Sequence, residues 1–103
     1  MKFVTIIMLA MAVVILFTAT SSASTTQVLI KDFKFQPQQV TISKGDTVTW
    51  THPGPASHTV KFSDSESPIL KEGGTYSKTF SQPGTYNYEC GIHPYMKGTV
   101  IVQ

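Results

Sequence analysis

The sequence predicts an all-β domain, a β-sandwich or small barrel of about eight strands, from three features of the chain after residue 24. Apolar and polar residues alternate with a period of two, Gly and Pro interrupt the chain at short intervals, and no stretch has the apolar spacing of an amphipathic helix. Short strands at this spacing are typical of sandwiches and small barrels. The chain of 103 residues has room for one small domain and no second core.

The first 23 residues are predicted to be a secretory signal peptide rather than part of the fold. Lys2 is followed by an apolar run without charges from Phe3 to Phe17, and small residues come next. Residues 21–23 offer a small-x-small cleavage site, so we expect the mature chain to begin at Ser24. A membrane anchor that is retained in the mature protein is the alternative interpretation of this apolar run. Either way we expect an exported protein, in the periplasm or on the outer face of the cell membrane.

The first four predicted strands carry β-branched and aromatic residues at alternate positions. They cover residues 27–31, 33–35, 40–42 and 47–51. Pro37 ends the second strand, and the turn sequence of residues 43–46 separates the third from the fourth. Two prolines in residues 52–55 end the fourth, because proline cannot continue a central strand.

The last four predicted strands hold the residues of chemical interest. They cover residues 58–62, 76–80, 85–90 and 97–102. A polar loop at 63–67, the pair Gly73-Gly74 and the turn Pro83-Gly84 separate them. Alternation places His58 on the inward face of its strand, with Val60 and Phe62, and Cys90 on the inward face of its own strand, with Tyr86 and Tyr88.

Charge and cysteine content narrow the function. Without Lys2 the mature chain has seven lysines against six acidic residues, a net charge of +1, which argues against nucleic-acid binding. Cys90 is the only cysteine, so no internal disulfide can staple this small domain. A free thiol in an exported protein is at risk of oxidation, and a bound metal both protects it and stabilises the fold.

A cysteine, a histidine and a methionine follow one another on one loop. Cys90, His93 and Met96 combine soft sulfur with imidazole, and His58 adds an inward imidazole from another strand. Each could be a packing residue alone, but together they favour copper among the available metals. Two His, one Cys and a weak axial Met form the type of site that copper uses for single-electron transfer.

At these residues the sequence resembles the cupredoxins, the small type 1 blue copper proteins, closest to the amicyanin, plastocyanin and pseudoazurin group. The resemblance covers the mature chain and lies in Phe33-x-Phe35-x-Pro37, Val40-x-Ile42-x-x-Gly45-Asp46-x-Val48-x-Trp50, Ser57-His58-Thr59-Val60 and Gly84-Thr85-Tyr86-x-Tyr88-x-Cys90-x-x-His93-x-x-Met96-x-Gly98-x-Val100. Two residues between Cys and His, and two between His and Met, match the short loop of amicyanins.

The resemblance implies an eight-stranded Greek-key β-sandwich over residues 24–103 that binds one type 1 copper ion. It implies the metal ligands His58, Cys90, His93 and Met96, and a monomeric, non-enzymatic electron carrier that serves redox protein partners. It also places His93 at the surface. We expect an apolar ring around it, built from Pro53, Pro55, Ala56, Pro94 and Tyr95.

Two residues depart from the family pattern. Thr59 follows the first ligand where the family usually has Asn, whose side chain ties the two ligand segments together; a hydroxyl has less reach. His52 stands where the family often has Asn. We expect it to be an exposed loop histidine beside Pro53, with partner contact or a second weak metal site as the alternatives.

Other functions fit the residues less well. A copper carrier or storage protein is the main alternative, but such proteins usually offer an open site on a flexible segment. A Cys/His hydrolase needs a base and an oxyanion pocket, for which about eighty residues leave little room. Structural zinc seldom uses Met.

Overall fold

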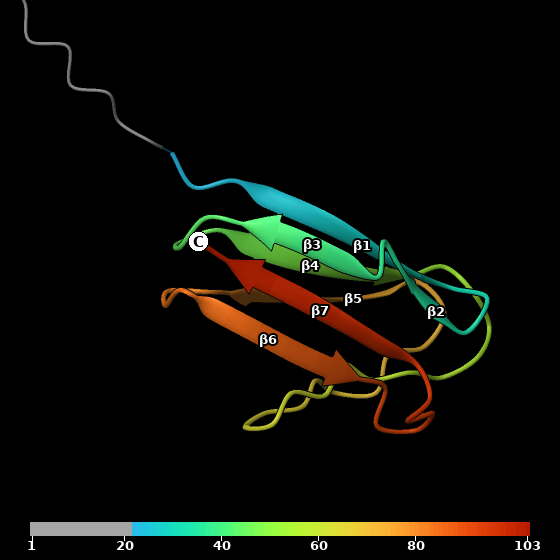
Figure 1. The fold of residues 1–103 in the computed structure, drawn as a ribbon. Coiled ribbons are helices and arrows are strands. Elements are labelled where there is room, and N and C mark those ends of the chain that lie inside the picture. The colour runs from blue at the N-terminus through green and yellow to red at the C-terminus, as the bar shows by residue number, and fades with distance from the viewer. Residues whose placement is uncertain (1–21) are drawn as a thin grey trace, which may run out of the picture.

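The structure is a computed structural model that describes residues 22–103, so the predicted signal peptide lies almost entirely outside the described residues. Within this range, seven strands form two facing sheets (Figure 1). In chain order they are β1 (Thr25–Lys31), β2 (Lys34–Gln36), β3 (Gln39–Ile42), β4 (Thr47–His52), β5 (Gly74–Thr79), β6 (Gly84–Glu89) and β7 (Lys97–Val102). Among the described residues, no helix has the length and apolar character needed to cross a membrane.

The all-β sandwich predicted from the sequence is confirmed. One sheet has the order β2-β1-β4-β5 and the other the order β3-β7-β6. Strands β1 and β4 pair in parallel, as do β3 and β7, while the remaining neighbours are antiparallel. Parallel pairing of non-consecutive strands means that the chain crosses between the sheets, which brings distant segments to a common edge.

The fifth predicted strand, residues 58–62, is wrong as a regular strand. Only isolated bridges occur there, from His58 to Leu70 and from Lys61 to Glu66 and Glu89. Two successive amides in this segment donate to side chains instead of a neighbouring strand: the amide of Thr59 donates to Cys90 Sγ, and the amide of Val60 donates to the Ser67 hydroxyl. The amides of His58 and Lys61 still donate to backbone carbonyls, at the isolated bridges. The described part of the chain therefore has seven strands where eight were expected.

The second predicted strand begins one residue later than expected. Asp32 and Phe33 form the two-residue turn between β1 and β2, with φ angles of 55° and 56°. Positive φ at both central residues matches the twist of a tight hairpin, but it is an uncommon conformation for a bulky side chain. The turn leaves Phe33 46% exposed, whereas Phe35 is buried in the core.

A cluster of aromatic rings fills the space between the sheets. Trp50 is fully buried, and its Nε1 donates a hydrogen bond of 3.1 Å to the Tyr88 hydroxyl. Burial raises the pKa of Tyr88 to about 12, against a smaller opposing effect of the Trp50 hydrogen bond. Gly98 lies opposite Tyr88 on β7, where a Cβ would collide with the tyrosine ring. The position of Tyr88 therefore requires glycine at this point of the strand.

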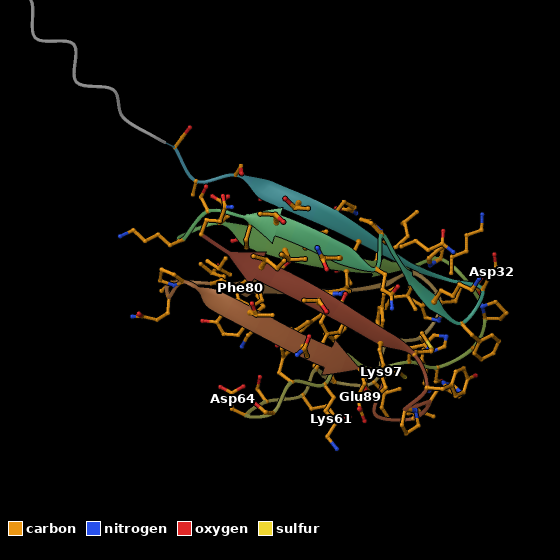
Figure 2. All side chains as sticks on the ribbon, in the orientation of Figure 1. Asp32, Lys61, Asp64, Phe80, Glu89 and Lys97 are labelled. Atoms are coloured by element: carbon orange, nitrogen blue, oxygen red, sulfur yellow. The ribbon has the colours of Figure 1, made fainter. Side chains whose placement is uncertain are left out.

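Three connections meet at one end of the sandwich and provide the candidate site. They are the β1–β2 turn and the beginning of the long β4–β5 connection, at the right of Figure 1, and the β6–β7 loop, at its lower right. The C-terminus lies at the opposite end. Figure 2 shows Asp32 of the β1–β2 turn at the site end and Phe80, just after β5, toward the other end.

Candidate metal centre

Three of the four predicted ligands form a compact triangle of donor atoms. The distance from Cys90 Sγ is 3.7 Å to His58 Nδ1 and 3.7 Å to His93 Nδ1, and the two Nδ1 atoms are 3.3 Å apart. His58 and Cys90 are buried, with 2% and 0% of their surface exposed, and His93 is half-buried. These three residues form a group that could hold a metal ion.

The size of the triangle fits one first-row transition metal ion. An ion in the plane of the three donors would have bonds of about 2.3 Å to sulfur and about 2.0 Å to each nitrogen. With trigonal angles, these bonds place the sulfur about 3.7 Å from each nitrogen and the two nitrogens about 3.5 Å from each other. The distances in the structure are close to these values. One thiolate and two imidazoles are the donor set that copper prefers.

His58 is fixed by its backbone and its environment. Its amide and carbonyl pair with Leu70, at 3.1 and 2.7 Å. Burial lowers the pKa of His58, and the nearby imidazoles of His52 and His93 lower it further. A lowered pKa keeps the ring neutral at physiological pH, which is the form that binds a metal.

The loop from Cys90 to Met96 closes on itself. The Cys90 amide donates to the Met96 carbonyl at 3.0 Å, and the Met96 amide donates to the His93 carbonyl at 2.9 Å. Met96 is 2% exposed and belongs to the hydrophobic core. These short-range bonds hold Cys90, His93 and Met96 on one turn directly after β6, as the spacing of the sequence predicts.

Thr59 links the two ligand segments, despite its shorter side chain. Its amide donates to Cys90 Sγ at 3.4 Å, and its hydroxyl accepts a hydrogen bond of 2.8 Å from the Gly91 amide. The hydroxyl in turn donates to Glu66 Oε2 at 2.8 Å. Thr59 therefore joins the segment of His58 to the loop of Cys90 in the place where the family pattern usually has Asn.

The expectation that His52 is an exposed loop residue is wrong. His52 is the last residue of β4, is 2% exposed and contacts the His58 ring edge-on, with ring centroids 4.8 Å apart. Its Nδ1 lies 3.4 Å from the Ile30 carbonyl, and its Nε2 contacts the Ala56 carbonyl. The alternation of Val48 and Trp50 simply continues through His52, so the strand ends after this residue and not before it.

Apolar side chains surround the exposed edge of the centre. The Phe33 ring contacts both His58 and His93 edge-on, at 5.4 and 5.1 Å between centroids, and Tyr95 lies 5.9 Å from His93. Tyr95 is 68% exposed. A groove of about 470 Å³ adjoins His58; among its lining residues are Phe33, Pro53, Pro55 and Ala56.

Sequence reasoning missed Phe33 and Glu66 as neighbours of the centre. Phe33 was assigned to a strand, and Glu66 lies in a loop expected only to be polar. Both reach the site through contacts between residues far apart in the chain. The sequence carries no local signal for Glu66, whereas Asp32 before Phe33 is a turn-forming residue that could have indicated the hairpin.

The fold and the donor triangle together define a class: a small β-sandwich protein with one thiolate- and imidazole-rich metal centre at the end of the sandwich. Comparisons with known proteins agree. The family model of the cupredoxin-like domain matches residues 5–102. Amicyanin-alpha from Methylorubrum extorquens is 43% identical over 79% of this chain and 74% of its own length.

Further relatives extend the similarity. Amicyanin from Paracoccus denitrificans is 35% identical over 72% of this chain and 62% of its own length, and plastocyanin from Scenedesmus fuscus is 36% identical over 67% and 86%. A solved Cu(I) structure of an amicyanin variant superimposes with a TM-score of 0.74 at 33% identity, covering 82% of this chain and 87% of that one.

The chain therefore belongs to the cupredoxin-like family. It is a small copper electron-transfer protein, and its arrangement of His58, Cys90, His93 and Met96 is typical of a single type 1 copper site.

Proposed function

We propose that this protein carries single electrons between two redox proteins outside the cytoplasm, with one copper ion held by His58, Cys90, His93 and Met96. The observation that supports this most is the triangle of one sulfur and two imidazole nitrogens, buried on the core side and half-exposed at His93. When bound, copper supplies a one-electron couple between Cu(I) and Cu(II).

Backbone hydrogen bonds fix the two ligand segments of the site. His58 is fixed by two backbone hydrogen bonds to Leu70, and Cys90 by a backbone bond to Met96. Because both ligand segments are tied to the sandwich, the donor atoms move little when the charge of the site changes. Small movement lowers the reorganisation energy of electron transfer. A firmly held ion also argues against a storage function, because a storage protein has to release its metal.

His93 is the proposed contact point for redox partners. It is the half-buried member of the donor triangle, and Phe33 and Tyr95 lie beside its ring. A small apolar surface suits brief docking, because electron-transfer complexes bury little area and separate quickly. We propose that the protein is a monomer. We also propose that it performs no catalysis of its own, since the Cys90 sulfur is buried beyond the reach of a substrate.

We further propose that residues 1–23 direct export to the periplasm and are removed before Ser24. The contacts of Ser24 support this position, because its backbone nitrogen lies 3.0 Å from Asp46 Oδ1. Cleavage there would place a positively charged α-amino group against a carboxylate. Mass spectrometry of the exported protein gives its first residue, and a mass that includes residues 1–23 would indicate a retained anchor.

The copper assignment is tested by the visible spectrum of the copper-loaded protein. We expect an intense blue colour from thiolate-to-copper charge transfer, and its loss in Cys90→Ser, because a hydroxyl is a harder and less covalent ligand. A strongly coloured Cys90→Ser protein would refute the assignment of Cys90.

The docking surface is tested by electron self-exchange between Cu(I) and Cu(II) copies, which needs no known partner. We expect Tyr95→Lys to slow self-exchange, because it places like charges on the contact surface of both copies. Leu29→Lys is the control, since Leu29 is exposed on β1 and adds the same charge elsewhere. Equal rates in the two variants would contradict docking through the surface beside His93.

A further inference from the structure

We propose that Glu66 is a positioning residue of the copper centre, which acts by orienting the hydroxyl of Thr59 toward the Gly91 amide. The inference rests on the proposed function, because it assigns to Glu66 a role in a centre built on His58 and Cys90. Glu66 lies in the connection between β4 and β5. Among the described residues, its side chain forms no hydrogen bond with a ligand side chain; its partner is Thr59.

Three groups form a continuous chain of hydrogen bonds. The Gly91 amide donates to Thr59 Oγ1 at 2.8 Å, and this hydroxyl donates to Glu66 Oε2 at 2.8 Å. Gly91 directly follows the ligand Cys90, and Thr59 directly follows the ligand His58. These two hydrogen bonds therefore connect both ligand segments to one carboxylate.

The carboxylate determines which way the hydroxyl proton points. A threonine hydroxyl has one proton and two lone pairs, and it rotates freely unless a partner fixes it. An ionised carboxylate only accepts hydrogen bonds, so the proton of Thr59 points toward Glu66 and a lone pair is left for Gly91. Hydrogen bonds to a charged group are stronger than neutral ones, and a chain of bonds polarises its members.

The backbone around Glu66 is braced against the same part of the sandwich. Glu66 forms an isolated bridge with Lys61, and Lys61 exchanges two backbone hydrogen bonds with Glu89, at 2.7 and 3.0 Å. Glu89 is the residue before Cys90; Figure 2 shows its label beside that of Lys61. Next to Glu66, the Ser67 hydroxyl accepts from the Val60 amide at 2.9 Å. The backbone that carries the Glu66 carboxylate is thus fixed by hydrogen bonds, although Glu66 itself is exposed.

Gly91 shows that the carboxylate lies directly against the ligand loop. A Cβ at Gly91 would collide with Glu66 Oε2 and would lie 2.8 Å from Thr59 Oγ1. Only glycine allows the carboxylate and the hydroxyl to approach this closely. The Thr59 amide also donates to Cys90 Sγ at 3.4 Å, so the position of Thr59 affects a hydrogen bond to the ligand sulfur.

The test compares Glu66→Gln with Glu66→Ala, because glutamine removes the charge but keeps an acceptor oxygen and alanine removes both. In the copper-free protein, we expect the Gly91 amide to exchange with solvent about fivefold faster in Glu66→Ala than in the unaltered protein, the effect of losing about 1 kcal/mol from one hydrogen bond. Glu66→Gln should stay within about twofold of the unaltered protein on the same measure.

The same two variants should differ in the copper-loaded protein. We expect both to raise the reduction potential, because a nearby negative charge favours Cu(II), and Glu66→Ala to raise it more and to change the electron paramagnetic resonance spectrum. In a Thr59→Val background, which lacks the hydroxyl, the two Glu66 variants should have the same reduction potential and the same spectrum.

Equal amide exchange and equal potentials in Glu66→Gln and Glu66→Ala would overturn the proposal, since Glu66 would then act only as a charge. A difference that persists at full size with Thr59→Val would also overturn it. The amide-exchange comparison in the copper-free protein does not depend on the copper assignment, which fails separately if the unaltered protein gives no blue colour.

Discussion

Ser24 and Asp46 are joined by two hydrogen bonds at the end of the sandwich away from the metal centre. The Ser24 backbone nitrogen donates to Oδ1 at 3.0 Å, and the Ser24 hydroxyl donates to Oδ2 at 3.1 Å. The Ser43 amide adds a third bond, to Oδ2 at 3.1 Å. The Ser24 carbonyl also accepts from the Thr47 amide. One nearly buried carboxylate therefore ties the start of β1 to the turn before β4.

This arrangement predicts an acid-sensitive contribution to stability. Hydrogen bonds from the Ser24 backbone, then from the Ser43 backbone, lower the pKa of Asp46 below 3.8. Because the folded pKa is the lower one, the unfolded chain binds the proton first. The stabilisation is complete well above pH 3.8 and is lost as pH falls below it.

We therefore expect Asp46→Asn to unfold at lower urea concentration than the unaltered protein at pH 6, and the gap to narrow toward pH 3. Asn keeps one acceptor oxygen but presents NH₂ donors to groups that are themselves donors. Asp64→Asn is the control, because Asp64 is exposed and, among residues 22–103, its side chain accepts only from the neighbouring Ser65 hydroxyl at 3.3 Å. A gap that is the same at both pH values would contradict the role of Asp46.

Local patterns predicted most of this fold. The strands with strict alternation appear within one or two residues of their expected bounds, and the ligand loop after β6 was visible as Cys90, His93 and Met96 in close sequence. Both signals depend on residues near one another in the chain. Periodicity of two fixes the inward face, and the short loop closes through its own backbone bonds.

The parts that could not be predicted depend on distant partners. Residues 58–62 were expected to be a strand, yet alternation could not show that the amides of Thr59 and Val60 donate to Cys90 Sγ and Ser67 Oγ. Thr59 is buried on the side expected to face solvent because it contacts Gly91 and Glu66. His52 was expected in a loop because the prolines after it suggest that the strand ends at residue 51, whereas β4 ends at His52.

The hydrogen bond between Trp50 and Tyr88 predicts a second effect on stability. Tyr88→Phe removes the acceptor of the Trp50 Nε1 proton in a fully buried position, and we expect it to lower the free energy of unfolding by about 1–3 kcal/mol. Tyr86→Phe is a matched control. Its hydroxyl donates to the Gln82 carbonyl at an exposed site, and its loss should change stability by less than about 0.5 kcal/mol.

Urea denaturation of the two variants measures this difference. Equal losses in both would mean that the buried bond contributes no more than the exposed one. Combining Tyr88→Phe with Trp50→Phe should cost less than the sum of the two single changes, because the second change removes the unpaired donor.

Met96 is expected to tune the reduction potential more than it holds the metal. Met96→Leu keeps a similar volume in the core, so the fold should tolerate it at a cost below about 1.5 kcal/mol. Loss of a weak sulfur donor destabilises Cu(II) more than Cu(I), so the potential should rise while the blue colour remains. Voltammetry and the visible spectrum test this together. A Met96→Leu protein that binds no copper would make Met96 a principal ligand instead of a weak one.

Removal of copper should lower the melting temperature substantially. The small domain has no disulfide, since its one cysteine is buried and free. A ligand that binds only the folded state stabilises it by about 4 kcal/mol at a free concentration a thousand times its dissociation constant.

For a domain of this size, each 1 kcal/mol shifts the melting temperature by about 4–8 °C, so the copper-free form should melt at least about 15 °C lower. Calorimetry of both forms measures the shift, and Mg²⁺ is the control ion, because a hard cation has little affinity for thiolate and imidazole. The fold should survive in the copper-free form, because the backbone bonds of His58 and Cys90 do not involve the metal. Equal melting temperatures with and without copper would mean that these residues do not form a tight site in the native fold.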